Sequence, residues 1–162
     1  MQTRTSVFAL LPFCLVALVH AQKDAGKSAP PAGGDKTAVE TKDAPKPIGP
    51  YSQAIKAGGF VFCAGQAAID PATGQLVQGD AAAQADRTMK NLSAVLTAAG
   101  TDMDHAVKVT IFLKNIADFA AVNEVYAKYF KGPPPARSTV QVAALPRDAL
   151  VEIDIIAVLP AK

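Results

Sequence analysis

The chain has 162 residues, enough for one domain with its own hydrophobic core. It carries 16 Lys and Arg against 14 Asp and Glu, and residues 47–162 hold ten of each sign, so that part of the chain is neutral. Without Trp or a basic cluster, it gives no support for nucleic-acid binding.

The first 21 residues follow the order of a secretory signal peptide. Arg4 supplies a positive start, residues 7–19 are apolar, and Val19-His20-Ala21 offers a cleavage site after Ala21. The apolar stretch is interrupted by Pro12 and is shorter than the roughly 20 residues that span a bilayer. We therefore expect residues 1–21 to be removed and the protein to be exported, periplasmic or secreted, without a stable membrane anchor.

A lipid anchor at Cys14 is the weaker interpretation, because the residues before it are not the small ones that precede a lipidated cysteine. If Cys14 is removed with the signal, Cys63 alone remains and cannot form an intramolecular disulfide. Residues 22–46 are rich in Ala, Pro, Gly and Lys and show no period. They predict a disordered tether that precedes a domain at 47–162.

The domain begins with a predicted hairpin. Residues 52–57 favour a short strand, and Gly58-Gly59 separates them from the apolar, β-favouring residues 60–64. The continuous apolar run predicts that the second strand is buried on both faces. Residues 70–74, Asp-Pro-Ala-Thr-Gly, predict a turn.

Two helices and three more strands follow. The periodicity predicts a helix capped by Asp80 and ended by Gly100, a strand at 107–114 and a helix at 119–130. The Gly-Pro-Pro-Pro run stops the second helix before strands at 138–143 and 150–158, which we expect to pair as a hairpin. The order ββαβαββ predicts an α+β fold with two helices packed on one face of a mixed sheet.

Standard catalytic motifs are absent from the sequence. It has no Gly-rich phosphate loop, CxxC or HExxH, and its two histidines, His20 and His105, do not provide a zinc site or a Ser-His-Asp triad. Cys63 lies in an apolar strand, which favours a small core residue over a nucleophile. The residues thus imply neither a metal nor a cofactor.

Two charged residues interrupt the last predicted strands. Period two places Arg137, Thr139 and Gln141 on one face, away from the apolar side, and places Glu152 opposite the core-facing residues of its strand. A guanidinium suits a carboxylate ligand, and a carboxylate can take a proton from water. Periodicity alone favours the simpler alternative of solvated charges or an interface ion pair.

Several motifs together resemble the RidA (YjgF-like) family of imine deaminases, over about residues 48–158. The C-terminal motif is Pro135-Ala136-Arg137-Ser138-Thr139-Val140, followed by Leu145-Pro146 and Val151-Glu152-Ile153-Asp154. The others are the opening Ile48-Gly49-Pro50-Tyr51-Ser52-Gln53-Ala54, then Ala64-Gly65-Gln66 with Asp70-Pro71 and Thr73-Gly74, and the helix residues Asp118, Phe119, Ala120, Val122, Asn123 and Tyr126.

The resemblance implies a chorismate-mutase-like RidA fold in a barrel-like homotrimer with clefts between subunits. It implies hydrolysis of short 2-imino acids, and of enamine tautomers such as 2-aminoacrylate, to 2-keto acids and ammonia without metal or cofactor. Arg137 would then bind the substrate carboxylate, and Glu152 would position or deprotonate the attacking water. By the same resemblance Tyr51, Gly65 and Asn123 would line the pocket.

One position departs from the family pattern, since many relatives carry Cys where this chain has Thr139. Thr139 keeps a small polar group beside Arg137, so we expect binding with an altered rate or substrate preference. A C-terminal hairpin would leave Arg137 and Glu152 roughly 13 Å apart, too far for contact in a flat sheet. A non-catalytic carboxylate-binding or chaperone-like trimer is the alternative function, and a ribonuclease-like activity ranks third.

Overall fold

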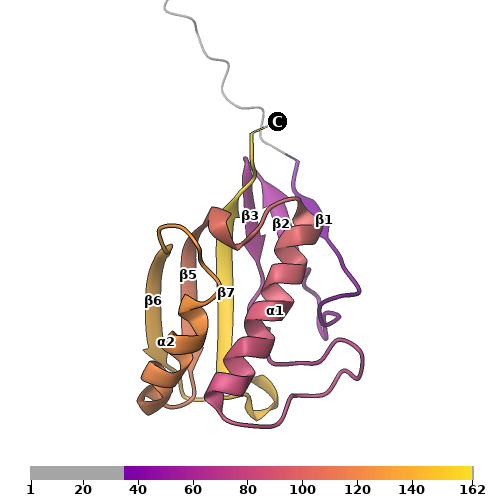
Figure 1. Ribbon diagram of the computed structural model, residues 1–162. Coiled ribbons are helices and arrows are strands. Elements are labelled where there is room, and N and C mark those ends of the chain that lie inside the picture. The colour runs from indigo at the N-terminus through magenta and orange to yellow at the C-terminus, as the bar shows by residue number, and fades with distance from the viewer. Residues whose placement is uncertain (1–34, 162) are drawn as a thin grey trace, which may run out of the picture. The chain divides into compact units, whose positions relative to one another are not determined.

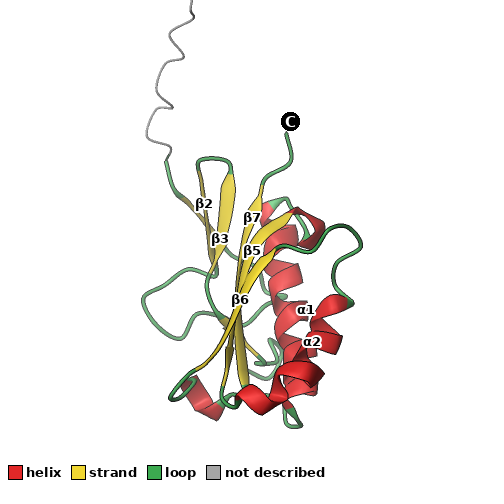
Figure 2. Ribbon diagram, turned by 90° about the vertical axis from the view of Figure 1, so that its left-hand side faces the viewer, coloured by secondary structure: helices red, strands yellow, loops and turns green. Residues whose placement is uncertain are grey.

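The computed structural model describes residues 35–161, so the predicted signal peptide at 1–21 and the first part of the predicted tether lie outside the described residues. In this part of the chain two helices, α1 (Ala81–Ala99) and α2 (Phe119–Ala127), pack on one face of a mixed sheet (Figures 1 and 2). The predicted α+β architecture is confirmed. None of the described helices is both long and apolar enough to cross a membrane.

The sheet has seven strands in the order β1-β2-β3-β7-β5-β6, with β4 pairing to β7 beside β3. Their bounds are β1 Thr37–Val39, β2 Ala54–Ala57, β3 Phe60–Cys63, β4 Gln66–Ala67, β5 Ala106–Leu113, β6 Ala136–Gln141 and β7 Val151–Val158. Three 3-10 turns complete the order, at Met103–His105, Ile116–Asp118 and Pro146–Asp148. β5 and β6 are parallel and the other pairs are antiparallel.

The first helix follows its sequence signals. The Asp80 carboxylate accepts a hydrogen bond from the Ala83 amide at 2.8 Å, and Gly100 ends the helix in the left-handed conformation with φ 89°. The second helix ends at Ala127, three residues before the predicted end, in turns closed by i to i+3 bonds from Lys128 and Tyr129.

The expected hairpin between the last two strands is wrong. β5 lies between β6 and β7, because β5, α2 and β6 form a parallel strand-helix-strand unit and β7 then pairs antiparallel to the other edge of β5. The predicted direction of Arg137 is also wrong. Arg137 pairs with buried Val109 and its side chain lies against α2, on the helix side of the sheet.

Within residues 35–161 both α-helices lie on one side of the sheet, and its second face is covered by neither of them (Figure 2). Phe60 and Phe62 of β3 are 39% and 43% exposed on it, so the prediction that β3 is buried on both faces does not hold for the single chain. Val61 between them is fully buried under the helix layer. The alternation in β3 is therefore that of a strand covered on one side.

The predicted disordered tether is wrong for residues 35–46. β1 pairs with β2, and Val39 and Ala44 are buried. The buried Gln53 amide holds this segment: it accepts from the Thr41 amide at 2.7 Å and donates to the carbonyls of Thr41, Ala44 and Pro45 at 2.8–3.2 Å. A single glutamine thus fastens the segment to the domain, because it supplies the partners that these backbone groups need.

We predict that a chain starting at residue 47 is less stable than one starting at Asp35. Removing residues 35–46 takes away β1 and all the backbone groups that hydrogen-bond the Gln53 side chain. We expect the unfolding free energy to fall by about 1–3 kcal/mol. Urea unfolding of the two chains measures the difference. Equal stabilities would show that this segment contributes nothing to the fold.

Candidate functional site

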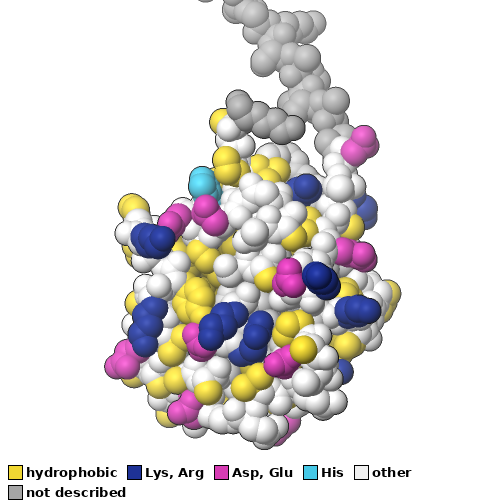
Figure 3. Space-filling model, turned by 45° about the vertical axis from the view of Figure 1, so that its right-hand side comes forward, with side chains coloured by type: hydrophobic (Ala, Val, Ile, Leu, Met, Phe, Trp, Pro, Cys, Tyr) yellow, Lys and Arg dark blue, Asp and Glu magenta, His cyan; other side chains and the backbone are white. Residues whose placement is uncertain are grey.

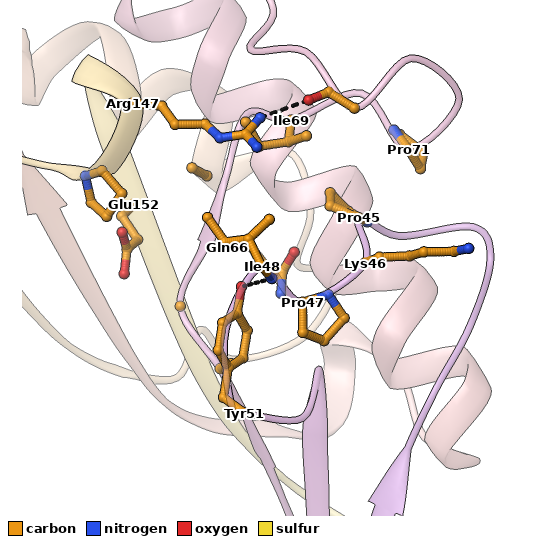
Figure 4. Close-up of a pocket in the computed structure, with 15 residues that line it drawn as sticks. Pro45, Lys46, Pro47, Ile48, Tyr51, Gln66, Ile69, Pro71, Arg147 and Glu152 are labelled. Atoms are coloured by element: carbon orange, nitrogen blue, oxygen red, sulfur yellow. Dashed lines mark hydrogen bonds between the residues drawn. The ribbon is translucent and has the colours of Figure 1, made fainter.

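The residues predicted to act together fall into two groups within one chain. Tyr51, Gly65 and Glu152 line one cavity of about 520 Å³ (Figure 4). Asn123 and Arg137 line a second hollow of about 440 Å³ beside α2. Thr139 follows Arg137 on the same strand and points to the same side of the sheet.

The pairing of the strands explains this separation. Arg137 lies in one row with Val109 and Ile155, so Glu152 is two strands and three residues away, roughly 14 Å along the sheet. The two side chains also point to opposite faces, since Glu152 alternates with the buried residues of β7. The separation that the sequence indicated is therefore real, although its cause is an intervening strand.

A shift in register places Glu152 against backbone. β3 and β4 both pair with β7, but their registers differ by one residue, so Ala64 and Gly65 leave the ladder between them. Glu152 fills the space above Gly65: a Cβ added there would lie 2.9 Å from its carboxyl carbon. A residue without a side chain is needed for this close approach.

The surroundings of Glu152 change its acidity. Burial, and to a smaller extent the nearby charge of Asp154, raises the pKa of the Glu152 carboxyl above its usual range. A carboxylate with a raised pKa is a stronger base than an exposed one. Glu152 is thus suited to accept a proton from water in the cavity.

Arg137 is held in place by α2. Its guanidinium lies 4.7 Å from the centre of the Tyr126 ring and 5.5 Å from that of Phe119, and its Nη1 donates to the Asn123 side-chain oxygen at 2.8 Å. Stacking of this kind contributes about 0.5–2 kcal/mol and fixes the plane of the group. The remaining N–H donors can then meet a carboxylate in pairs.

Phe119 and Tyr126 are residues of the helix motif to which the sequence assigned no role in the site. Their spacing with Asn123, at i, i+4 and i+7, was the available signal, because it puts all three on one face of α2. The buried hydroxyls of Tyr126 and Thr139 have no hydrogen-bond partner among the described residues. Both hydroxyls lie near Arg137, so this region contains two polar groups that are free to hydrogen-bond a ligand.

Neither a reactive cysteine nor a metal site is found in the part of the chain that the structure describes. Burial and the charge of Asp154 raise the pKa of the Cys63 thiol to about 12, so this cysteine is protonated at neutral pH and is no nucleophile. No three His, Cys, Asp or Glu side chains within residues 35–161 gather as possible metal ligands. Lys, Arg, Asp and Glu side chains are interspersed over the face seen in Figure 3.

The sequence and the fold match a known family. Residues 41–159 match the family model described as Endoribonuclease L-PSP. Protein DfrA of Myxococcus xanthus is 58% identical over 125 residues, 76% of this chain and 95% of that protein. The 2-iminobutanoate/2-iminopropanoate deaminase of Mus musculus is 48% identical over 120 residues, 74% of this chain and 89% of that protein.

A solved structure agrees with the sequence relatives. The crystal structure of E. coli TdcF with bound serine superposes with a TM-score of 0.73 at 39% identity, covering 76% of this chain and 99% of that one. The chain belongs to the RidA (YjgF-like) family, whose model carries the Endoribonuclease L-PSP name. The resemblance inferred from the motifs is confirmed.

We predict that Gly65→Ala moves Glu152 while leaving the fold intact. The added methyl group would occupy the place of the Glu152 carboxylate, and only a flexible side chain has to shift. The displaced carboxyl should meet more water, so its pKa should fall from its raised value toward that of an exposed glutamate. NMR titration of Glu152 measures this. A pKa unchanged from wild type would show that Gly65 does not position the carboxylate.

Proposed function

We propose that the protein hydrolyses short 2-imino acids to 2-keto acids and ammonia in clefts shared between the subunits of a homotrimer. The observation that carries this proposal is the division of the site. The carboxylate-binding group and the base lie on opposite faces of one sheet, so a second copy is needed to unite them. The relative named as an imine deaminase supports the reaction.

The uncovered sheet face supports the assembly. It exposes Phe60, Phe62 and Val140, each about two-fifths accessible, on the side of the sheet that carries Glu152. Large apolar side chains exposed on one face of a sheet are typical of a subunit interface. A homotrimer would bury this face and bring the half-sites of neighbouring chains together.

The groups are suited to imine hydrolysis. Arg137, oriented by Tyr126, Phe119 and Asn123, would hold the substrate carboxylate. Glu152 would take a proton from water as the oxygen bonds to the imine carbon, and would pass it to the carbinolamine nitrogen to make it a leaving group. As the C–N bond breaks, Glu152 would take the hydroxyl proton from the forming carbonyl and pass it to the departing ammonia. Iminium and water thus give ketone and ammonium, with atoms and charge balanced. Because an imine carbon is already electrophilic, positioning and a modest base suffice.

The substitutions Arg137→Lys and Glu152→Gln should fail in different ways. Lysine keeps the charge but loses the two-pronged geometry, so pyruvate and substrate should both bind more weakly. Glutamine removes the base, so turnover of 2-iminopropanoate generated in situ should fall by about 10² to 10⁴ while pyruvate affinity is retained. Full turnover by folded Glu152→Gln would contradict the assignment. A wild-type protein that binds pyruvate but does not hydrolyse 2-iminopropanoate would favour the carboxylate-binding alternative.

Stability separates this proposal from a structural ion pair. Because the pKa of Glu152 is raised in the folded state, the folded chain binds a proton at this carboxyl more tightly than the unfolded chain does. The ionised carboxylate therefore lowers the free energy of unfolding at pH 7. This cost disappears when the pH falls below the pKa of an unfolded glutamate. Glu152→Gln should therefore melt at an equal or higher temperature than wild type at pH 7. An ion pair would instead make both substitutions lower the melting temperature.

The same two variants test the shared cleft. When they are unfolded together and refolded, some clefts receive Arg137 from one chain and Glu152 from another. Random mixing restores about a quarter of the clefts, so activity should reappear at that fraction of wild type. If mixed refolding restores no activity, Arg137 and Glu152 act from the same chain.

We also propose that the protein is exported and that its mature chain starts at Gln22. The basic start, apolar stretch and Val-His-Ala site support this. Mass spectrometry of the protein from its native host should find Gln22 as the first residue. An intact Met1 in a cytoplasmic fraction would contradict export.

A further inference from the structure

Two loops meet at one end of the cavity that holds Glu152. The first is the turn of residues 70–74, which is closed by bonds from the Ala72 amide to the Asp70 carboxylate at 2.7 Å and from the Gly74 amide to the Asp70 carbonyl at 2.8 Å. The second is the loop of residues 145–148. Arg147 Nη1 donates to the Gly74 carbonyl at 2.7 Å and joins them across 73 positions of sequence.

The backbone beneath Arg147 is held in an unusual conformation. Arg147 and Asp148 have φ values of 57° and 62°, a region that residues with a side chain seldom adopt, and here two adjacent residues adopt it. Lys114 Nζ fixes the second of them through the Asp148 carboxylate at 2.5 Å. Interactions on both sides of the strained pair therefore aim the guanidinium at the opposite loop.

The cavity has a polar part and an apolar part. Glu152 and the Gly65 backbone form the polar part, and the wall toward the joined loops is apolar, lined by Ile69, Pro71 and Pro146. Figure 4 shows Arg147 stretched along this end beside Ile69, with Tyr51 at the other end. Pro47 and Ile48 lie beside Tyr51, where the Ile48 amide donates to the Tyr51 hydroxyl at 3.3 Å. The buried Asn91 amide donates to the Ala67 and Ile69 carbonyls at 3.1 and 2.9 Å, which fixes the wall to α1.

We propose that Arg147, through its bond to Gly74, closes the part of the cavity that receives the substrate side chain and thereby limits its length. This inference rests on the proposed function. When the carboxylate of a 2-imino acid binds Arg137 and its imine carbon lies beside Glu152, the remaining group on that carbon is the substrate side chain. This side chain then contacts the apolar wall. Arg147 is thus a specificity-determining residue and takes no part in proton transfer.

The test compares two substrates in one variant. Arg147→Met keeps an unbranched side chain at an exposed position but removes the link to Gly74. The ratio of kcat/KM for the leucine-derived imine to that for 2-iminopropanoate should rise by about 5- to 50-fold, since a few methylene groups gain space. Lys46→Met is the matched control: its charge is on the cavity rim, but Figure 4 shows its side chain directed away, so the ratio should stay at the wild-type value.

The outcomes separate the two proposals. A wild-type protein that hydrolyses neither imine overturns the proposed function. Activity in wild type with an unchanged ratio in Arg147→Met, or an equal rise in Lys46→Met, overturns the role of Arg147 alone. If Arg147→Met melts below the assay temperature, Arg147→Asn replaces it. Asparagine tolerates the left-handed conformation of this position, and its short side chain cannot span the distance to the Gly74 carbonyl. The ratio should shift in the same direction, and an unchanged ratio would overturn the inference.

Discussion

The pleat of β7 is the constraint on which the rest of the structure depends. This strand pairs with β3, β4 and β5, and its buried residues Val151, Ile153, Ile155 and Ala157 form the floor on which the helix layer packs. Because successive side chains of a strand point to opposite faces, Glu152 must point to the face that α1 and α2 do not cover. A carboxylate facing the other way would lie unpaired in the core, so the same alternation that builds the core also places Glu152 in the cavity on the open face.

Much of this fold follows from local patterns. The cap residues Asp80 and Gly100 mark α1 in the sequence, and the Gly58-Gly59 pair marks the turn between β2 and β3. Strand order is different, because it depends on contacts between residues far apart in the chain. The last two strands look like a hairpin in sequence, yet β5 occupies the position between them. The strand-helix-strand order of β5, α2 and β6 was the local sign that these two strands run parallel.

The site divides in a similar way. Family motifs identified Arg137, Glu152, Tyr51, Gly65 and Asn123, but periodicity gave Arg137 the wrong face because β6 lies at an edge where the side toward α2 is only partly covered. The ordered segment before residue 47 was also missed. Its composition resembles a linker, and its order comes from Gln53, whose amide bonds no local pattern reveals. Where order depends on one distant polar group, composition is a poor guide.

The high pKa of Cys63 has a consequence beyond catalysis. With its pKa raised to about 12, the thiol stays protonated at neutral pH, and the thiolate is the form that reacts with peroxides and disulfides. Partial burial of Cys63 against the core therefore also lowers its reactivity toward oxidants. Unfolding would expose the thiol to water and lower its pKa, so unfolded chains are more open to disulfide exchange through this residue than folded ones.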